Sequence, residues 1–158
     1  MRVAVLTVFG AAALCWTPTA TAEQSGHATP SGPTTVVVVA CERFNEALNL
    51  AAQHYDEFAY ATAGTGDAVN YADPQVWRSN VIGRTALREA AHSVFSASRT
   101  LGLPSEVADP MRAWSLQATK LMVIMGMRGG GDSLNAAANQ LNADARDTEI
   151  ACALRARG

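Results

Sequence analysis

Lysine is almost absent from this sequence, and its basic residues never form a run. Lys120 is the single lysine among the 158 residues, and the 12 lysines and arginines are spread thinly along the chain. They face 14 acidic residues, which gives a formal net charge of −2 at pH 7. A protein that binds nucleic acid by neutralising phosphates needs a basic stripe. The sequence has none, so we expect no nucleic-acid partner.

The chain also lacks a hydrophobic run long enough to cross a membrane. Its most apolar segment, Val3 to Trp16, spans about 14 residues, whereas a transmembrane helix needs about 20. Only 16% of the residues are charged and 6% are aromatic, yet 49% are hydrophobic. These proportions exclude a disordered or collagen-like chain, and the length leaves room for one globular domain.

The N-terminal segment has the parts of a secretory signal peptide. Arg2 precedes the short apolar run, and the small residues Ala20-Thr21-Ala22 follow it. A charged start, an apolar centre and an A-x-A exit predict cleavage after Ala22. We therefore predict a signal peptide over residues 1–22, a flexible leader over residues 23–35, rich in Ser, Thr, Gly and Pro, and a folded domain over residues 36–158.

Three cysteines are present, and the first, Cys15, lies inside the predicted signal peptide. The other two, Cys41 and Cys152, remain in a protein sent to an oxidising compartment, so we predict a disulfide between them. Cys41 follows Val38-Val39-Ala40, which resembles a lipid-attachment motif, but some 25 mostly polar residues separate it from the apolar run. Lipidation at Cys41 is therefore an alternative, and we expect no membrane anchor.

Apolar residues recur at helical spacing in four segments, approximately 41–62, 74–101, 110–127 and 132–154. Asp73-Pro74 and Asp109-Pro110 each combine a capping residue with proline at the first helical position. The β-branched run 34–39 has two interpretations, a short extended arm or the first turn of the first helix. The residues predicted to face the core are Phe44, Leu48, Ala51, Tyr55, Phe58, Trp77, Leu87, Ala91, Val94, Ser98, Leu101, Met111, Trp114, Ala118, Leu121, Met122, Met125, Leu134, Ala138, Leu141, Ala145, Thr148 and Cys152.

Short connections between these segments favour antiparallel neighbours, and hence an all-α, up-down-up-down four-helix bundle. In that topology the start of the first helix and the end of the fourth lie at the same end. Cys41 and Cys152 occupy those two points, so the predicted disulfide and the predicted topology support each other.

No catalytic or metal-binding set emerges from the sequence. Glu89 and His92 have the E-x-x-H spacing of di-iron bundles, but the third helical segment has no Asp or Glu between Met111 and Met127 to complete a site. At 100° per residue, Glu89 and His92 should also point to solvent. No serine motif or phosphate-binding loop is present either. We therefore expect no enzymatic activity, no metal and no cofactor.

The third helical segment has more apolar residues than one buried face can hold. Beyond its core face, it carries the apolar residues Leu116, Val123, Ile124 and Met127, and only Arg112 and Lys120 are charged residues among them. Either this helix is buried on all sides, or these four residues form a contact surface for a protein partner, a second copy or a lipid. We predict a secreted binding domain that uses this surface.

A second hypothesis is a carrier of a small apolar or haem-like ligand in a cleft between helices. His54, or a nearby tyrosine such as Tyr55, would then contact the ligand. Aromatic residues at helical spacing are more often part of the core, so the contact surface is the first hypothesis.

The whole pattern resembles the small exported helical proteins of mycobacteria and related actinobacteria. It comprises the A-x-A signal, the Cys-x-x-Phe-x-x-Ala-Leu opening at Cys41, the stretch GRTALREAA at 83–91 and the closing cysteine. The strong preference for arginine over lysine fits the GC-rich genomes of those bacteria. This resemblance implies a helical fold and a secreted or envelope-associated location. Most of those proteins have no assigned activity, so it implies no site residues.

Overall fold

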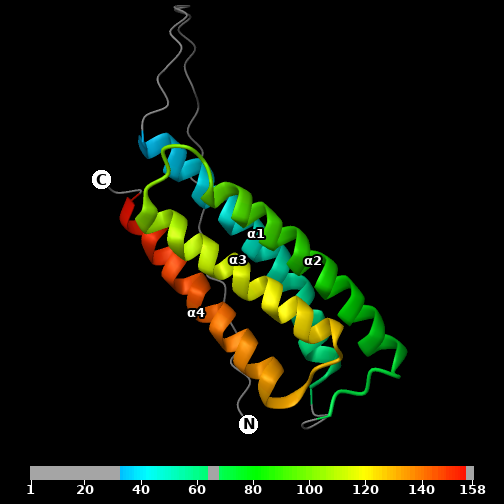
Figure 1. Ribbon diagram of the computed structural model, residues 1–158. Helices are drawn as coiled ribbons and strands as arrows, with labels where there is room; N and C mark the ends of the chain where they lie inside the picture. The colour runs from blue at the N-terminus through cyan, green and yellow to red at the C-terminus, as the bar shows by residue number, and fades with distance from the viewer. Residues whose placement is uncertain (1–32, 64–67, 156–158) are drawn as a thin grey trace, which may run out of the picture.

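The computed structural model describes residues 33–63 and 68–155, and these form four antiparallel α-helices (Figure 1). They are α1 (Pro33–Ala61), α2 (Pro74–Ser98), α3 (Ser105–Gly126) and α4 (Gly131–Arg155). The described part contains no β-strand. Each helix packs against the next one along the chain, so the predicted all-α, up-down-up-down bundle is confirmed. The predicted signal peptide, and the predicted leader up to residue 32, lie outside the described residues.

Helix α1 begins at Pro33, eight residues before the predicted start and inside the predicted leader. The 34–39 run is therefore helical, and the extended-arm interpretation is wrong. Tertiary packing overrides the β-propensity of the valines, because Val37 and Ala40 are 3% and 2% exposed and extend the buried stripe that continues at Phe44. Val38 and Val39 remain partly exposed on the other side.

Helix α2 begins where its capping residues predict. The carboxylate of Asp73 accepts hydrogen bonds from the backbone N–H groups of Gln75 and Val76, at 2.7 and 3.3 Å, and Pro74 follows it. Two predicted core residues are wrong, however. Trp77 is 56% exposed, and Leu101, which lies beyond the helix end at Ser98, is 95% exposed.

The buried stripe of α2 begins one position before Trp77, at Val76, and continues through Ser79, Asn80 and Gly83, so the tryptophan lies outside it. Asn80 is buried and its Nδ2 donates to the carbonyl oxygen of Met125, at 3.2 Å. Gly83 is also buried, and a Cβ there would lie 3.2 Å from the carbonyl oxygen of His54 and 3.3 Å from Cε of Met125. The glycine thus permits a close approach of α1 and α2 at this point.

Helix α3 begins at Ser105, so the predicted start at Pro110 is wrong and this proline lies inside the helix. The extra turn is stabilised by burial, since Val107 and Ala108 are 0% and 2% exposed. Their backbone N–H groups donate to the carbonyl oxygen of Pro104, at 3.1 and 2.9 Å. Asp109 does not cap the helix but pairs with Arg112, at 3.0 Å.

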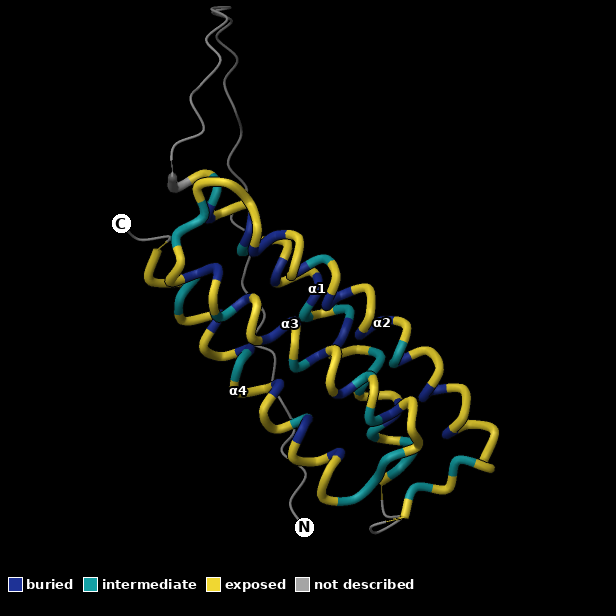
Figure 2. Tube along the Cα trace, viewed as in Figure 1, coloured by how far each residue is buried: buried dark blue, intermediate teal, exposed yellow. Residues whose placement is uncertain are grey.

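Buried residues occur along the length of the bundle (Figure 2). Most side chains of the core are small or aliphatic. Its largest member, Trp114 of α3, meets Phe44 of α1 edge to face, with ring centroids 5.5 Å apart. The predicted core residues that are buried are Phe44, Ala51, Phe58, Leu87, Ala91, Val94, Ser98, Met111, Trp114, Ala118, Leu121, Met125, Leu134, Leu141, Ala145 and Thr148.

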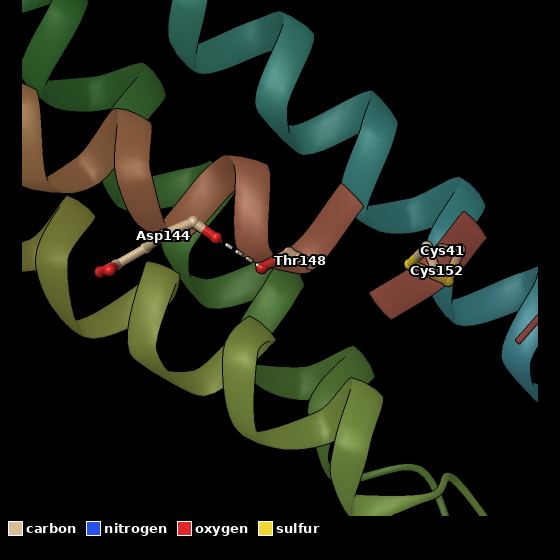
Figure 3. The surroundings of a disulfide bond; sticks show 4 residues. All are labelled: Cys41, Asp144, Thr148 and Cys152. Atoms are coloured by element: carbon tan, nitrogen blue, oxygen red, sulfur yellow. Dashed lines mark hydrogen bonds between the residues drawn. A yellow bond between two sulfur atoms is a disulfide. The ribbon is translucent and has the colours of Figure 1, made fainter. Parts of the chain in front are cut away.

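The fourth side of the bundle is closed differently from the other three. Helices α1 and α4 contact each other far less than the sequential pairs do. Across this side runs the predicted disulfide, which joins Cys41 to Cys152 with their Cα atoms 5.8 Å apart (Figure 3). One turn before Cys152, Thr148 is fully buried and its hydroxyl donates to the carbonyl oxygen of Asp144, at 2.8 Å. The covalent bond thus holds the end helices where packing is least extensive.

At the opposite end, α3 terminates in a Schellman motif. The backbone N–H of Gly129 donates to the carbonyl oxygen of Ile124, at 2.9 Å, and that of Arg128 to Met125, at 3.2 Å. Arg128 has φ 59°, in the left-handed region that favours glycine. The hydroxyl of Tyr71 donates to the carbonyl oxygen of Gly129, at 2.7 Å, and so ties the α1–α2 connection to the α3–α4 connection.

Removing the disulfide should destabilise the bundle strongly. Replacing both cysteines, Cys41→Ser with Cys152→Ser, frees a loop of 111 positions, for which the chain-entropy model gives about 4 to 5 kcal/mol. Urea denaturation of the double variant should show a fall of this order in the free energy of unfolding. A fall below about 1 kcal/mol would mean that packing alone holds α1 and α4 together.

The Schellman motif makes opposite predictions for two adjacent residues. Arg128→Gly relieves a left-handed backbone and should stabilise the protein by about 1 kcal/mol. Gly129→Ala should destabilise it by about 1 to 3 kcal/mol, because the new Cβ would lie 2.6 Å from Cγ2 and 3.0 Å from the carbonyl oxygen of Ile124. Thermal unfolding of both variants checks the pair, and equal effects of the same sign would contradict this account.

Candidate functional site

The outward side of α2 and α3 is the candidate site, and it combines exposed apolar side chains with arginines. On α2 one row of side chains recurs every three or four residues, with one gap of seven, so its members share one side of the helix. This row is Trp77, Val81, Arg84, Arg88, Phe95 and Arg99. The row Arg112, Leu116, Val123 lies on α3 at spacings of four and seven. We call this surface the α2–α3 face; it consists of Trp77, Val81, Arg84, Arg88, Phe95, Arg99, Arg112, Leu116, Met122 and Val123.

Two buried hydrogen bonds set the register of these antiparallel helices. The hydroxyl of Ser115 donates to the carbonyl oxygen of Ala91, at 2.6 Å, and Asn80 donates to that of Met125. In this register Leu116 lies level with the stretch between Arg88 and Phe95. Val123 lies level with Val81. The apolar residues of both helices therefore alternate with arginines along one continuous surface.

The apolar side chains of the α2–α3 face are large and accessible. Leu116 is 66% exposed, Trp77 56%, and Val123 46%. Phe95 and Val81 are each 40% exposed. Scattered exposed apolar residues are normal on a protein, but a group of this size on two adjacent helices is typical of an interaction site.

The arginines of the α2–α3 face lie among these apolar groups. Arg84 and Arg88 line a hollow of about 120 Å³ with Val81 and Met122. The guanidinium of Arg84 packs against Gly126, where a Cβ would lie 3.2 Å from Cζ, and its buried Nε has no hydrogen-bond partner. Glycine at position 126 thus lets the arginine lie flat on α3.

At the other end of the face, Arg99 and Arg112 share a wider hollow of about 500 Å³ with Phe95. The guanidinium of Arg99 lies 5.7 Å from the centroid of the Phe95 ring, in cation–π contact. Arg112 pairs with Asp109, while within the described residues Arg84, Arg88 and Arg99 form no ion pair with a carboxylate. The exposed Arg88 and Arg99 and the partly buried Arg84 are thus not neutralised by an ion pair within the described part of the bundle.

The four residues predicted as a contact surface do not form one strip. Leu116 and Val123 lie on the α2–α3 face, as described above. Ile124 is only partly exposed and packs against the core, because the Schellman turn brings Gly129 back over it. Met127 is 72% exposed and caps α3 one turn after Val123, where its backbone N–H donates to the carbonyl oxygen of Val123, at 2.9 Å.

Sequence reasoning missed the contribution of α2. The sequence pattern predicts Trp77 in the core, and Val81, Phe95 and the arginines become neighbours of α3 residues only when the two helices pair. The three- and four-residue spacing from Trp77 to Arg88 was a usable signal, since it marks a second mixed apolar and basic row on this helix.

His54 lines a groove of about 220 Å³ between α1 and α2, together with Leu50, Val81, Ile82, Thr85, Ala86 and Glu89. Its Nδ1 lies 3.7 Å from Oε2 of Glu57 and makes no hydrogen bond. Ligand pockets usually measure about 300 to 1,000 Å³, so this groove is small for one.

Tyr55, the other predicted ligand contact, packs against the core instead of lining that groove. Its ring lies 6.3 Å from that of Phe58, which stacks in turn on Tyr71 at 6.3 Å. Burial raises the pKa of Tyr55 to about 12, and the charges of Asp56 and Tyr71 add to this effect. The structure therefore does not bring His54 and Tyr55 together around one cavity.

Glu89 and His92 are both exposed on α2. Among the described residues, no group of three or more His, Cys, Asp or Glu side chains has the arrangement to hold a metal ion. No helix in the described part is long and apolar enough to cross a membrane.

The fold and the disulfide define a class of protein, a small disulfide-linked four-helix bundle domain. Residues 21–153 match the family described as the Rv2240c four-helix bundle domain, and the chain belongs to this family. The family carries the name of a mycobacterial protein, in agreement with the resemblance to small helical proteins of mycobacteria. No curated protein and no solved structure matches the chain.

The raised pKa of Tyr55 predicts a loss of stability in alkaline solution. The neutral hydroxyl is favoured in the folded state, so its contribution is complete below the ordinary pKa of 10 and is lost as the pH rises from 10 to about 12. The loss should reach about 2 to 3 kcal/mol. Urea unfolding should show it in the wild type and in the control Tyr60→Phe, whose ring is 81% exposed. An equal loss in Tyr55→Phe, which cannot ionise, would contradict the assignment.

Proposed function

We propose that this four-helix bundle is an exported binding domain without catalytic activity, and that its contact surface is the α2–α3 face. One observation carries the proposal. Leu116 and Val123 of α3 are exposed on the side of the bundle that also carries exposed Trp77, Val81 and Phe95 of α2, and arginines lie among the α2 residues. Aromatic residues and arginine are enriched at protein contact sites, which supports a binding role for a surface of this composition.

The exposed apolar side chains of this surface would contribute to the free energy of binding. Complete burial of an exposed leucine, valine or phenylalanine side chain contributes about 1.5 to 3 kcal/mol. Leu116, Phe95 and Trp77 would therefore be the main apolar contributors. Their helices are also tied together by the buried Ser115 and Asn80 hydrogen bonds, so the surface is held rigid before a partner binds.

Export is supported by the sequence of the N-terminal segment and by the Cys41–Cys152 disulfide. Such bonds persist in oxidising compartments outside the cytosol. We propose a secreted or envelope-associated protein on this basis. A protein partner and a second copy of the chain are both candidates to bind the α2–α3 face.

Carriage of a small apolar or haem-like ligand is a weaker second proposal. It is favoured by the position of His54 beside Leu50 and Ile82 in the α1–α2 groove. The groove is small, however, and Tyr55 lies outside it, so one histidine would hold the ligand against an open surface.

The binding proposal is tested with a dye that fluoresces on apolar protein surface. The wild type should enhance its fluorescence, and the double variant Leu116→Ser with Val123→Ser should lose at least half of that signal. Ile150→Ser on α4, where the side chain is 58% exposed, is the matched control and should retain it. Thermal unfolding confirms that each variant is folded.

Sedimentation over a range of protein concentrations complements the dye measurement, because an exposed apolar face also favours self-association. A wild-type protein that binds no dye and keeps a monomer mass at all concentrations would refute a contact role for the α2–α3 face.

A further inference from the structure

Charge is strongly segregated in this bundle although the whole chain is nearly neutral. Residues 74–128, which comprise α2, α3 and their flanking turns, hold seven basic and three acidic residues, a formal charge of +4. Helices α1 and α4 together hold three basic and eight acidic residues, a formal charge of −5. The net charge of −2 for the chain conceals this division.

The topology turns the division along the sequence into a division in space. The helices follow one another around the bundle, so α2 and α3 occupy the side opposite to α1 and α4 (Figure 1). One side of the molecule is therefore basic and the other acidic. A field of this kind orients the molecule in front of a charged surface.

The few acidic residues of the basic side lie away from its central arginines. Glu106 pairs with Arg155 of α4, at 2.6 Å, and Asp109 pairs with Arg112. Glu89 lines the groove toward α1. Within the described residues Arg84, Arg88 and Arg99 therefore have no carboxylate paired with them, and Arg88 and Arg99 are exposed.

We infer that the α2–α3 face docks on an anionic lipid surface, with arginines on the phosphate headgroups and Trp77, Phe95 and Leu116 at the level of the acyl-chain boundary. This inference rests on the proposed function and names the partner of the same face. Basic residues beside exposed aromatic and aliphatic side chains are the features of helices that lie in a membrane interface. Trp77 in particular has an amphipathic ring that suits this depth.

The shape of the face suits a flat partner. Helices α2 and α3 have 25 and 22 residues, which corresponds to about 33 to 38 Å each, and they run antiparallel side by side. Apolar and basic groups occur along most of this length, from Trp77 to Arg99. The acidic α1 and α4 would be repelled by the same surface and so face away from it.

A second copy of the chain fits this face less well. Its acidic side lies opposite the basic one, so pairing the two would be a head-to-tail contact that leads to rings or open filaments and not to a closed dimer. The exposed apolar residues of α1 and α4, namely Val38, Val39, Tyr60, Ile150 and Leu154, also lie near the helix ends and do not match the row along α2.

The test is flotation of the processed protein, as it is released by its host, with vesicles of phosphatidylglycerol and with vesicles of phosphatidylcholine. We expect binding to the anionic vesicles that weakens as salt is raised, and little binding to the zwitterionic ones. Tryptophan emission should shift to shorter wavelength on binding, and the shift should be lost in Trp77→Phe.

Paired variants separate the two sides of the molecule. Arg84→Gln with Arg88→Gln should weaken binding to anionic vesicles about 25-fold, since each arginine near such a surface contributes about fivefold. The matched control, Arg43→Gln with Arg146→Gln, removes the same charge from α1 and α4 and should leave affinity unchanged. Thermal unfolding of the wild type, Trp77→Phe and the two double variants shows that each protein is folded.

Several results would overturn the inference. These are equal binding to both kinds of vesicle, equal losses in the two double variants, an emission shift that persists in Trp77→Phe, or salt-sensitive self-association in place of vesicle binding. If vesicles are not bound but the Leu116 and Val123 variant still loses dye binding, the lipid inference fails and the contact face stands. If neither assay gives a signal, both fail.

Discussion

The disulfide between Cys41 and Cys152 is the constraint on which the rest of the bundle depends. Three of its four sides are closed by extensive helix packing, whereas α1 and α4 contact each other little. The bond joins them at one end, and the Tyr71 hydroxyl closes the other end by its hydrogen bond to Gly129. The central core of Phe44 and Trp114 lies between these two closures. In this account the covalent bond supplies what a fourth packed seam would otherwise contribute.

Because the disulfide holds α1 and α4 together, the outward sides of α2 and α3 are not needed to close the bundle. Buried hydrogen bonds and the close contact of Gly83 with Met125 join α2 to α3. Gly83 also lies close to α1. A surface fixed in this way can present large apolar residues without losing its shape. Its charge is opposite to that of α1 and α4, so a scaffold with a formal net charge of −2 presents one basic, partly apolar side.

Much of the fold was predictable because local signals agree with the topology. Asp73-Pro74 marks the start of α2, the glycines at 129–131 mark the α3–α4 connection, and the two cysteines confirm which helix ends meet. The failures have physical causes. Val37 gains more from burial than its extended preference costs, and burial of Val107 extends α3 past Pro110. The candidate face was half predicted, through Leu116 and Val123, but its arginines become neighbours only when α2 and α3 pair.

Hydrogen exchange of the oxidised and the reduced protein tests the central claim most directly. Reduction should raise the exchange rates of backbone amides in the first half of α1 and the last half of α4, around Cys41 and Cys152. Amides of α2 and α3 should keep their protection, because the Ser115 and Asn80 hydrogen bonds and the core between them remain. An equal rise in all four helices, or no change in any of them, would contradict the claim that the disulfide holds α1 and α4 together.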